Sequence, residues 1–273
     1  MLRFLIFSDL DGTLLDHHTY AWTPARPALR LMDETDTPLV LVSSKTRVEI
    51  ESLRIELGNR HPFIPENGGA IFIPAGYPLD PPPAAVDLAP YRAVILGRRV
   101  EEIAIAFDRL AERLPVRALS RLDPVEVAAL TGLTIEQARA ARGREFGEAF
   151  LLDDPGIPES ELVREVEALG LRLTRGGRFY HLLGENDKGR AVRMLADMYR
   201  QRQSPLITAA CGDAPNDAPM LAAVDRPFLV ARPDGSHAPM DVPGMVRVPL
   251  PGPAGFNQAV TGLLAGPSSG IDS

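Results

Sequence analysis

The sequence predicts an α/β protein with an open parallel-sheet core and a second domain inserted into that core. Short apolar runs at 2–7, 38–42 and 206–210 each end in polar residues, which is typical of parallel strands buried on both faces. Ser43 and Lys188 are 145 positions apart, far more than one crossover between neighbouring strands requires. The chain therefore has room for a further domain between the second and third strands.

Two aspartates follow the first apolar run. Asp9 and Asp11 lie one residue apart in the segment FSDLDGT. Ligands of open parallel sheets bind beyond the carboxyl ends of the strands, and alternate residues of an extended chain point the same way, so both carboxylates can face one site. Such a pair can hold a hard cation against a phosphate. A solvated Asp-Gly turn after an ordinary strand is the alternative interpretation.

A second acidic cluster follows the third apolar run, in the segment CGDAPND. It contributes Asp213 and Asp217, which we expect at the same edge of the sheet as Asp9. Carboxylates crowded into one pocket favour a divalent cation, and all-oxygen ligands favour Mg²⁺ over zinc. A helix cap formed by Asn216 or Asp217 would also explain this segment.

Two more polar residues complete the set. Ser43 follows the second apolar run, where its hydroxyl could donate to a phosphate oxygen. Lys188 lies at the start of a predicted helix, where the helix dipole disfavours a cation, so it needs an anionic partner. Taken alone, a serine or a lysine is more often a solvated surface residue than part of a site. Only the order in which Ser43 and Lys188 occur with the aspartates points specifically to a phosphate-binding site.

Composition narrows the class of protein. The chain is 45% hydrophobic and 24% charged, as expected for a globular protein with a full core. A net charge of -7 argues against a general nucleic-acid binder, and Cys211, the single cysteine, cannot form an internal disulfide. The first apolar run is too short to cross a membrane and lacks the features of a secretory signal. We expect a cytoplasmic protein that acts on a small molecule, with no inferable protein partner.

The order of the motifs resembles that of the haloacid dehalogenase-like phosphatase superfamily. An Asp-x-Asp-Gly-Thr segment, a hydroxyl after the second strand, a lysine that opens a helix and a Gly-Asp-x-x-Asn-Asp segment follow one another along the chain. The resemblance covers about residues 1–75 and 184–264 and implies a doubly wound, Rossmann-like parallel sheet. It also implies phosphoryl transfer with Mg²⁺ as the cofactor.

The resemblance implies a role for each residue of the set. Asp9 would attack phosphorus and form an aspartyl-phosphate, while Asp11 would protonate the leaving oxygen and then activate water. Ser43 and Lys188 would hold the phosphate oxygens. The implied metal ligands are Asp9, Asp11 through its backbone carbonyl, Asp213 and Asp217.

The inserted segment has the patterns of an α+β domain. The predicted elements are a helix over 100–114, a helix that begins at Thr134, a strand over 146–152 and a hairpin over 171–183. An α+β insert at this place resembles the C2B cap of the superfamily, which closes over the phosphate and reads the leaving group. We therefore predict a core domain at 1–79 and 184–273 and a cap domain at 80–183, joined by a linker with a proline run at 81–83.

Segments around and within the insert resemble the mannosyl-3-phosphoglycerate phosphatase family. They are PENGG at 65–69, ARGREFGE at 141–148, RGGRFYH at 175–181 and SSKT at 43–46. The resemblance implies a substrate that is a phosphorylated glycoside of glycerate, hydrolysed to mannosylglycerate and phosphate. The candidate substrate-binding residues are Glu66, Asn67, Arg142, Arg144, Arg178 and His181. For any one of them, a surface ion pair is an equally good explanation.

Other functions stay open at this point. A glucosyl-3-phosphoglycerate phosphatase and a Cof-like phosphatase of simple sugar phosphates fit the same motifs, and the sequence does not reveal which hexose is preferred. A phosphomutase would use the same intermediate, but the 34 positions between Asp9 and Ser43 leave little room for its early cap. A non-catalytic phosphosugar-binding module is disfavoured, because the aspartates and Lys188 are intact.

Overall fold

The computed structural model describes residues 3–176 and 179–266 of the chain. The chain forms two compact units. The first comprises Met1–Ser43, Pro78–Asp80 and Lys188–Ser273, and the second comprises Ser44–Tyr77 and Pro81–Asp187. Residues 44–77, which the sequence analysis places in the core domain, belong to the second unit. The boundaries at 79/80 and 183/184 stay a prediction. No helix within the described residues has the length and apolar character needed to cross a membrane.

Parallel strands form the centre of the first unit. They are β1 (Arg3–Ser8), β2 (Leu39–Val42), β11 (Leu206–Gly212), β12 (Arg226–Ala231) and β13 (Val246–Pro251). They lie in the order β13-β12-β11-β1-β2, and each neighbouring pair runs parallel. Leu5, Ile6 and Phe7 on β1 are fully buried, as expected for a strand covered on both faces. The three strands predicted from the apolar runs are confirmed.

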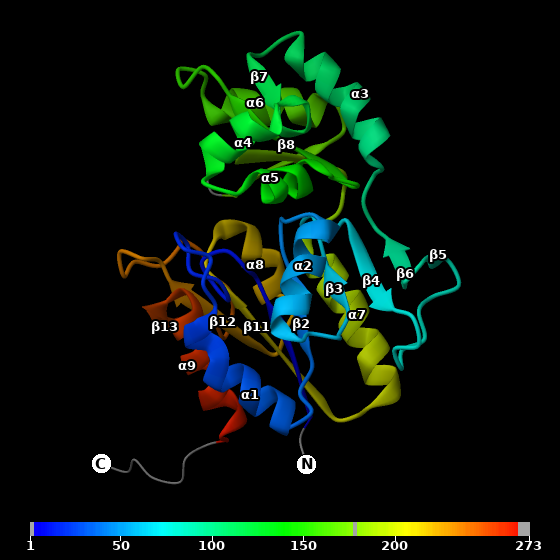
Figure 1. Ribbon diagram of the computed structural model, residues 1–273, viewed down its shortest axis with the longest axis vertical. Helices are drawn as coiled ribbons and strands as arrows, with labels where there is room; N and C mark the ends of the chain where they lie inside the picture. The colour runs from blue at the N-terminus through cyan, green and yellow to red at the C-terminus, as the bar shows by residue number, and fades with distance from the viewer. Residues whose placement is uncertain (1–2, 177–178, 267–273) are drawn as a thin grey trace. The chain divides into compact units, whose positions relative to one another are not determined.

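Helices of the first unit follow β1, β11 and β13 along the chain, and a further helix precedes β11. They are α1 (Arg26–Glu34), α7 (Lys188–Arg202), α8 (Ala218–Leu221) and α9 (Gly252–Leu264), with short 3-10 helices at Thr23–Ala25 and Pro215–Asp217. α1 packs on α9 (Figure 1). α7 packs on α8. Ala191, Leu195 and Met198 form a buried apolar stripe along α7, which makes this helix amphipathic. Helices that alternate with parallel strands confirm the α/β fold.

Gly189 in the first turn of α7 lies against the backbone of Pro219. A Cβ atom at position 189 would lie 2.2 Å from the Pro219 carbonyl oxygen, so the backbone would have to move. We expect Gly189→Ala to lower the free energy of unfolding in urea by about 2 kcal/mol or more, despite its gain in helix propensity. Gly262→Ala in α9 is the matched control, because among the described residues no atom outside its own stretch of helix lies within 4 Å of its Cβ position. Equal stability of the two variants would contradict this packing.

Antiparallel strands and one helix form the first part of the second unit. They are α2 (Arg47–Leu57), β3 (Phe63–Ile64), β4 (Ala70–Pro74), β5 (Val86–Leu88) and β6 (Tyr91–Ile95). β4 pairs with both β3 and β6, and β5 pairs with β6. Thr46 and Glu49 form the capping box that begins α2.

The rest of the second unit is a four-stranded antiparallel sheet with helices. The strands, in the order β7-β8-β10-β9, are Val116–Ala118, Gly147–Leu152, Phe179–Leu183 and Arg172–Gly176. The helices are α3 (Val100–Ala111), α4 (Pro124–Thr131), α5 (Ile135–Arg142) and α6 (Glu159–Ala168), with a 3-10 turn at Leu119–Arg121. The predicted strand, hairpin and helices are all present, and Thr134 caps α5 as expected. The α+β character of the insert is confirmed.

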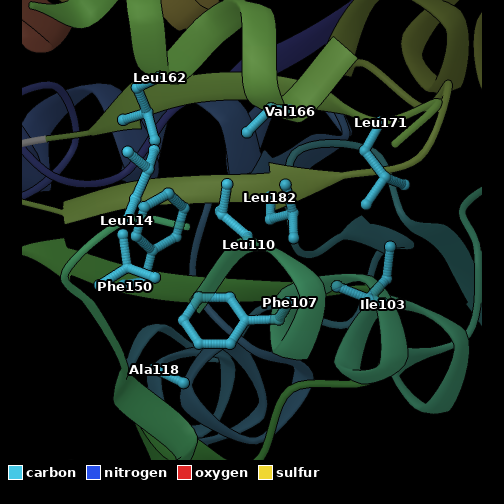
Figure 2. Packing of buried hydrophobic residues seen from close by; sticks show 11 residues of the cluster. Ile103, Phe107, Leu110, Leu114, Ala118, Phe150, Leu162, Val166, Leu171 and Leu182 are labelled. Carbon is cyan, nitrogen blue, oxygen red and sulfur yellow. The ribbon is translucent and has the colours of Figure 1, made fainter. Parts of the chain in front are cut away.

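Both faces of this antiparallel sheet are covered. Phe150 on β8 contacts Phe107 on α3, with the ring centroids 5.6 Å apart, and Leu162 of α6 joins the same cluster (Figure 2). The neighbouring Ala149 belongs to a second cluster, with Val127 of α4 and residues of α5. Successive residues of a strand point to opposite faces, so β8 divides the two clusters.

Candidate active site

Asp9 lies at the carboxyl edge of the parallel sheet. Its backbone N–H donates to the carbonyl oxygen of Cys211 at 3.0 Å, so the pairing of β1 with β11 continues up to Asp9. In the parallel register Ser8 lies opposite Cys211, and both strands therefore end at the same edge. Asp213 directly follows β11 and lies beyond that edge with Asp9. Both residues are buried.

The loop after β1 holds Asp213 in place. Gly12 has a φ of +83°, and a Cβ atom there would lie 2.5 Å from Asp213 Oδ2. Glycine alone combines this backbone conformation with so close an approach. Thr13 donates from Oγ1 to Asp213 Oδ1 at 3.2 Å. Thr13 belongs to the motif FSDLDGT and is a site residue that the sequence prediction missed, although a hydroxyl beside two carboxylates was the available signal.

Lys188 joins two of the buried carboxylates. Its Nζ donates to Asp9 Oδ1 at 2.5 Å and to Asp217 Oδ1 at 2.7 Å. Its side chain is 1% exposed, so the ammonium group is removed from bulk water. The anionic partners expected for a lysine at the start of α7 are therefore present.

Asp217 accepts hydrogen bonds from the local backbone as well as from Lys188. Its Oδ2 accepts from the backbone N–H groups of Asp213 at 3.1 Å and Ala214 at 3.0 Å. Its other oxygen accepts from Lys188. Asp217 thus belongs to the acidic cluster and also binds the backbone before the 3-10 helix, but its side chain does not cap α8 as the alternative interpretation expected.

The cluster carries an excess of negative charge. Carboxylate oxygens of Asp9, Asp213 and Asp217 lie within 4.8 Å of one another, against the single ammonium group of Lys188. Burial and repulsion from Asp217 raise the pKa of Asp9 well above its usual value, and the same causes raise the pKa of Asp213 to about 7. A buried group of oxygens with surplus negative charge fits a hard divalent cation. Within the described residues, this group is the one with the spacing of a metal site.

Ser43 and Asp11 lie at the same edge of the sheet. Ser43 follows β2, which pairs with β1, and its side chain is 1% exposed. Asp11 lies in the loop after β1, is partly exposed and repels Asp213 electrostatically. The structure therefore places all six predicted core residues at the ends of neighbouring elements, while their catalytic roles stay predictions.

Glu66 and Arg144, two of the predicted substrate-binding residues, contact each other in the second unit. The Glu66 carboxylate is fully buried, lies 3.6 Å from Arg144 Nε and accepts from the backbone N–H groups of Glu145 and Phe146. Arg144 Nη2 donates to the carbonyl oxygen of Ser44 at 3.0 Å. Burial raises the pKa of Glu66, and the positive charge of Arg144 opposes that rise.

The other predicted substrate-binding residues are spread over the second unit. Arg142 Nη2 donates to the carbonyl oxygen of Ser120 at 2.9 Å. Asn67 and His181 are buried, the former in the turn before β4 and the latter on β10. Arg178 lies outside the described residues. Contacts of these residues with a substrate stay predictions.

Comparison with known proteins extends the resemblance seen in the motifs. The family model of the haloacid dehalogenase-like hydrolases matches residues 6–81. The chain is 40% identical over 266 residues to the glucosyl-3-phosphoglycerate/mannosyl-3-phosphoglycerate phosphatase of Methanococcoides burtonii, covering 96% of this chain and 98% of that protein. It is 36% identical over 231 residues to the mannosyl-3-phosphoglycerate phosphatase of Pyrococcus furiosus, covering 84% and 91% respectively.

Solved structures share the fold at low sequence identity. A protein from Thermoplasma acidophilum superposes with a TM-score of 0.66 at 20% identity, covering 97% of both chains. The sucrose-phosphatase of Synechocystis, solved with sucrose and phosphate, superposes with a TM-score of 0.62 at 14% identity, covering 96% of this chain and 98% of that one. At these identities the likeness concerns the fold alone.

Proposed function

Because this chain belongs to the glucosyl-3-phosphoglycerate/mannosyl-3-phosphoglycerate phosphatase family of haloacid dehalogenase-like hydrolases, we propose that it hydrolyses mannosyl-3-phosphoglycerate to mannosylglycerate and phosphate. The observation that carries the proposal is the buried Lys188 between Asp9 and Asp217 at the end of β1. That arrangement is suited to phosphoryl transfer, in which catalysis consists mainly of positioning and charge stabilisation. The names of the relatives supply the substrate.

Asp9 is the proposed nucleophile. Lys188 donates to its Oδ1, which orients the carboxylate so that Oδ2 can attack phosphorus and form an aspartyl-phosphate. The raised pKa of Asp9 disfavours the charged form that attacks. Mg²⁺, held by Asp9, Asp213 and the backbone carbonyl of Asp11 with Asp217 close by, would supply the positive charge that keeps Asp9 ionised.

Asp11 is the proposed general acid and base. In the first step it gives its proton to the departing glycerate oxygen, and the P–O bond to glycerate breaks as the bond to Asp9 forms. In the second step Asp11 removes a proton from water, which attacks phosphorus and releases phosphate from Asp9. Ser43 and Lys188 hold phosphate oxygens through both steps.

Glucosyl-3-phosphoglycerate is a second candidate substrate. The relative from Methanococcoides burtonii carries both substrates in its name and matches nearly the whole chain. Mannose and glucose differ in the orientation of one hydroxyl group.

A phosphate-release assay tests the proposal. We expect kcat/KM for mannosyl- or glucosyl-3-phosphoglycerate to exceed that for mannose 6-phosphate by at least about 100-fold, because only the former present the glycerate carboxylate. EDTA should abolish release, and Mg²⁺ should restore it. Equal rates on all three esters would favour the Cof-like alternative, and hydrolysis in EDTA would contradict the metal.

A further inference from the structure

The turn before β4 places Glu66 in an unusual backbone conformation. Glu66 has a φ of +49° and Asn67 a φ of +55°, and such left-handed conformations cost free energy in residues other than glycine. The turn is held by its surroundings. The Glu66 N–H donates to the carbonyl oxygen of Lys45 at 2.9 Å, and Asn186 Nδ2 donates to the Glu66 carbonyl oxygen at 3.4 Å. Strain of this kind persists only where neighbouring contacts determine the conformation.

The side chain of Glu66 binds the backbone that follows Arg144. Oε1 accepts from the Glu145 N–H at 2.7 Å, and Oε2 accepts from the Phe146 N–H at 3.0 Å. Since the side chain is 0% exposed, a sugar hydroxyl has no surface of Glu66 to contact. These contacts argue against the direct substrate-binding role expected for Glu66 from the sequence.

Arg144 links Glu66 to the chain next to Ser43. Its Nε lies 3.6 Å from Glu66 Oε2, and its Nη2 donates at 3.0 Å to the carbonyl oxygen of Ser44, the residue that follows Ser43. The planar guanidinium therefore forms an ion pair with Glu66 on one side while it donates to the Ser44 carbonyl oxygen on another. The position of the Arg144 guanidinium against the Ser44 carbonyl oxygen therefore depends on its ion pair with Glu66.

Further contacts fasten the same two segments to each other. Thr46 Oγ1 donates to the carbonyl oxygen of Ala140 at 3.0 Å, and Arg47 Nε donates to Glu145 Oε1 at 2.7 Å. The segments 44–47 and 140–146 thus lie side by side within the second unit. Of these contacts, the one from Arg144 is nearest in the chain to Ser43.

We propose that Glu66 is a positioning residue that holds Arg144 against the Ser44 carbonyl and thereby fixes the backbone next to Ser43. The inference rests on the proposed function, in which the Ser43 hydroxyl holds a phosphate oxygen. Loss of the Glu66 charge then affects the step common to all phosphate esters. If Glu66 bound the sugar instead, its loss would affect only the substrates that carry the sugar.

Glu66→Gln separates these two roles, with mannosyl-3-phosphoglycerate and p-nitrophenyl phosphate as substrates. We expect kcat to fall at least about tenfold on both esters, with KM changed less than about threefold. Glu145→Gln is the matched control, because it removes the adjacent charge and its ion pair with Arg47 but leaves the contacts of Glu66. Its kcat should stay within about threefold of wild type. A rise in KM for the sugar-bearing ester alone, or an equal loss in the control, overturns the proposal.

Arg144→Lys provides a second test if Glu66→Gln does not fold. The lysine keeps a positive charge beside Glu66, but its single ammonium group cannot serve both Glu66 and the Ser44 carbonyl. We expect the same loss of kcat on both esters. In the double variant, which combines Glu66→Gln with Arg144→Lys, kcat should fall no further than in the worse single variant, because the two residues act through the same contact. Additive losses overturn the proposal.

Hydrogen exchange tests the positioning role of Glu66 without any measurement of turnover. In the wild-type chain the N–H groups of Glu145 and Phe146 are bound by Glu66, so we expect slow exchange there and at least about tenfold faster exchange in Glu66→Gln. Unchanged exchange overturns the proposal. If the wild-type chain hydrolyses no ester but hydrogen exchange responds as expected, the proposed function is wrong. The contacts by which Glu66 positions the segment around Arg144 would still be supported.

Discussion

Asp9→Asn is expected to lower kcat for phosphate release by at least about 10³-fold, because an amide cannot act as the attacking nucleophile. The fold should be retained. Asn has the same shape, and its Oδ1 can still accept from Lys188, which also keeps its bond to Asp217. Removal of one of three crowded carboxylates relieves repulsion, so we expect the free energy of unfolding without metal to equal or exceed that of wild type.

Urea unfolding and a phosphate assay on the same preparation measure both effects. Asp197→Asn is the control, since that carboxylate lies on the exposed face of α7 with 65% of its side chain accessible. It should leave activity and stability unchanged. Residual hydrolysis by Asp9→Asn near the wild-type rate would rule Asp9 out as the nucleophile, whatever the stability.

The core of the site could be predicted because its residues follow local patterns. Asp9 and Asp213 each follow a short apolar run, and parallel pairing of β1 with β11 brings the ends of those runs to one edge. Lys188 opens an amphipathic helix, and its place at the helix start already required an anion. The family inferred from these motifs is confirmed by the relatives, which match over most of the chain.

The environment of Glu66 could not be predicted from local sequence. The segment PENGG has the composition of an exposed polar turn. Its glutamate is buried because backbone N–H groups 79 and 80 positions later in the chain bind the carboxylate. No periodicity or spacing within either segment encodes that pairing, which forms only in the folded second unit.

The strands β5 and β6 were missed for a different reason. The proline run at 81–83 suggested a linker, and Val86–Leu88 is too short to show the alternation that marks a strand. β6 is formed by pairing with β4 over five residues, a contact that propensity alone does not reveal. The interpretation of the segment as a linker was therefore incomplete.

Lys188→Met is the second change expected to have a large effect. Without the ammonium group, Asp9 and Asp217 would face each other as buried carboxylates with no cation between them. Breaking a buried ion pair from one side costs about 3–5 kcal/mol, so we expect a loss of that size in urea unfolding with EDTA present. Adding Asp9→Asn to this variant should recover at least about 1 kcal/mol, because one uncompensated charge is gone.

The other lysine of the chain provides the control for that measurement. Of the 29 basic residues only Lys45 and Lys188 are lysines, and Lys45 lies 3.7 Å from Glu49 in an ion pair near the start of α2. Lys45→Met should cost clearly less than Lys188→Met, because the Glu49 carboxylate that it leaves behind still accepts from the backbone N–H and the hydroxyl of Thr46. If the free energy of unfolding falls by similar amounts in the two methionine variants, the charge of Lys188 does not stabilise the carboxylate cluster in the way proposed.

Lys188→Arg separates the charge of this residue from its shape. An arginine keeps the positive charge, but its planar guanidinium is larger than an ammonium group and would have to fit where Lys188 is 1% exposed between two carboxylates. We expect Lys188→Arg to regain part of the stability lost in Lys188→Met and to stay at least about 100-fold below wild type in kcat, because Asp9 and the phosphate oxygens would be displaced. Wild-type turnover by Lys188→Arg would mean that charge alone suffices at this position, and the orienting role given to the lysine would then be wrong.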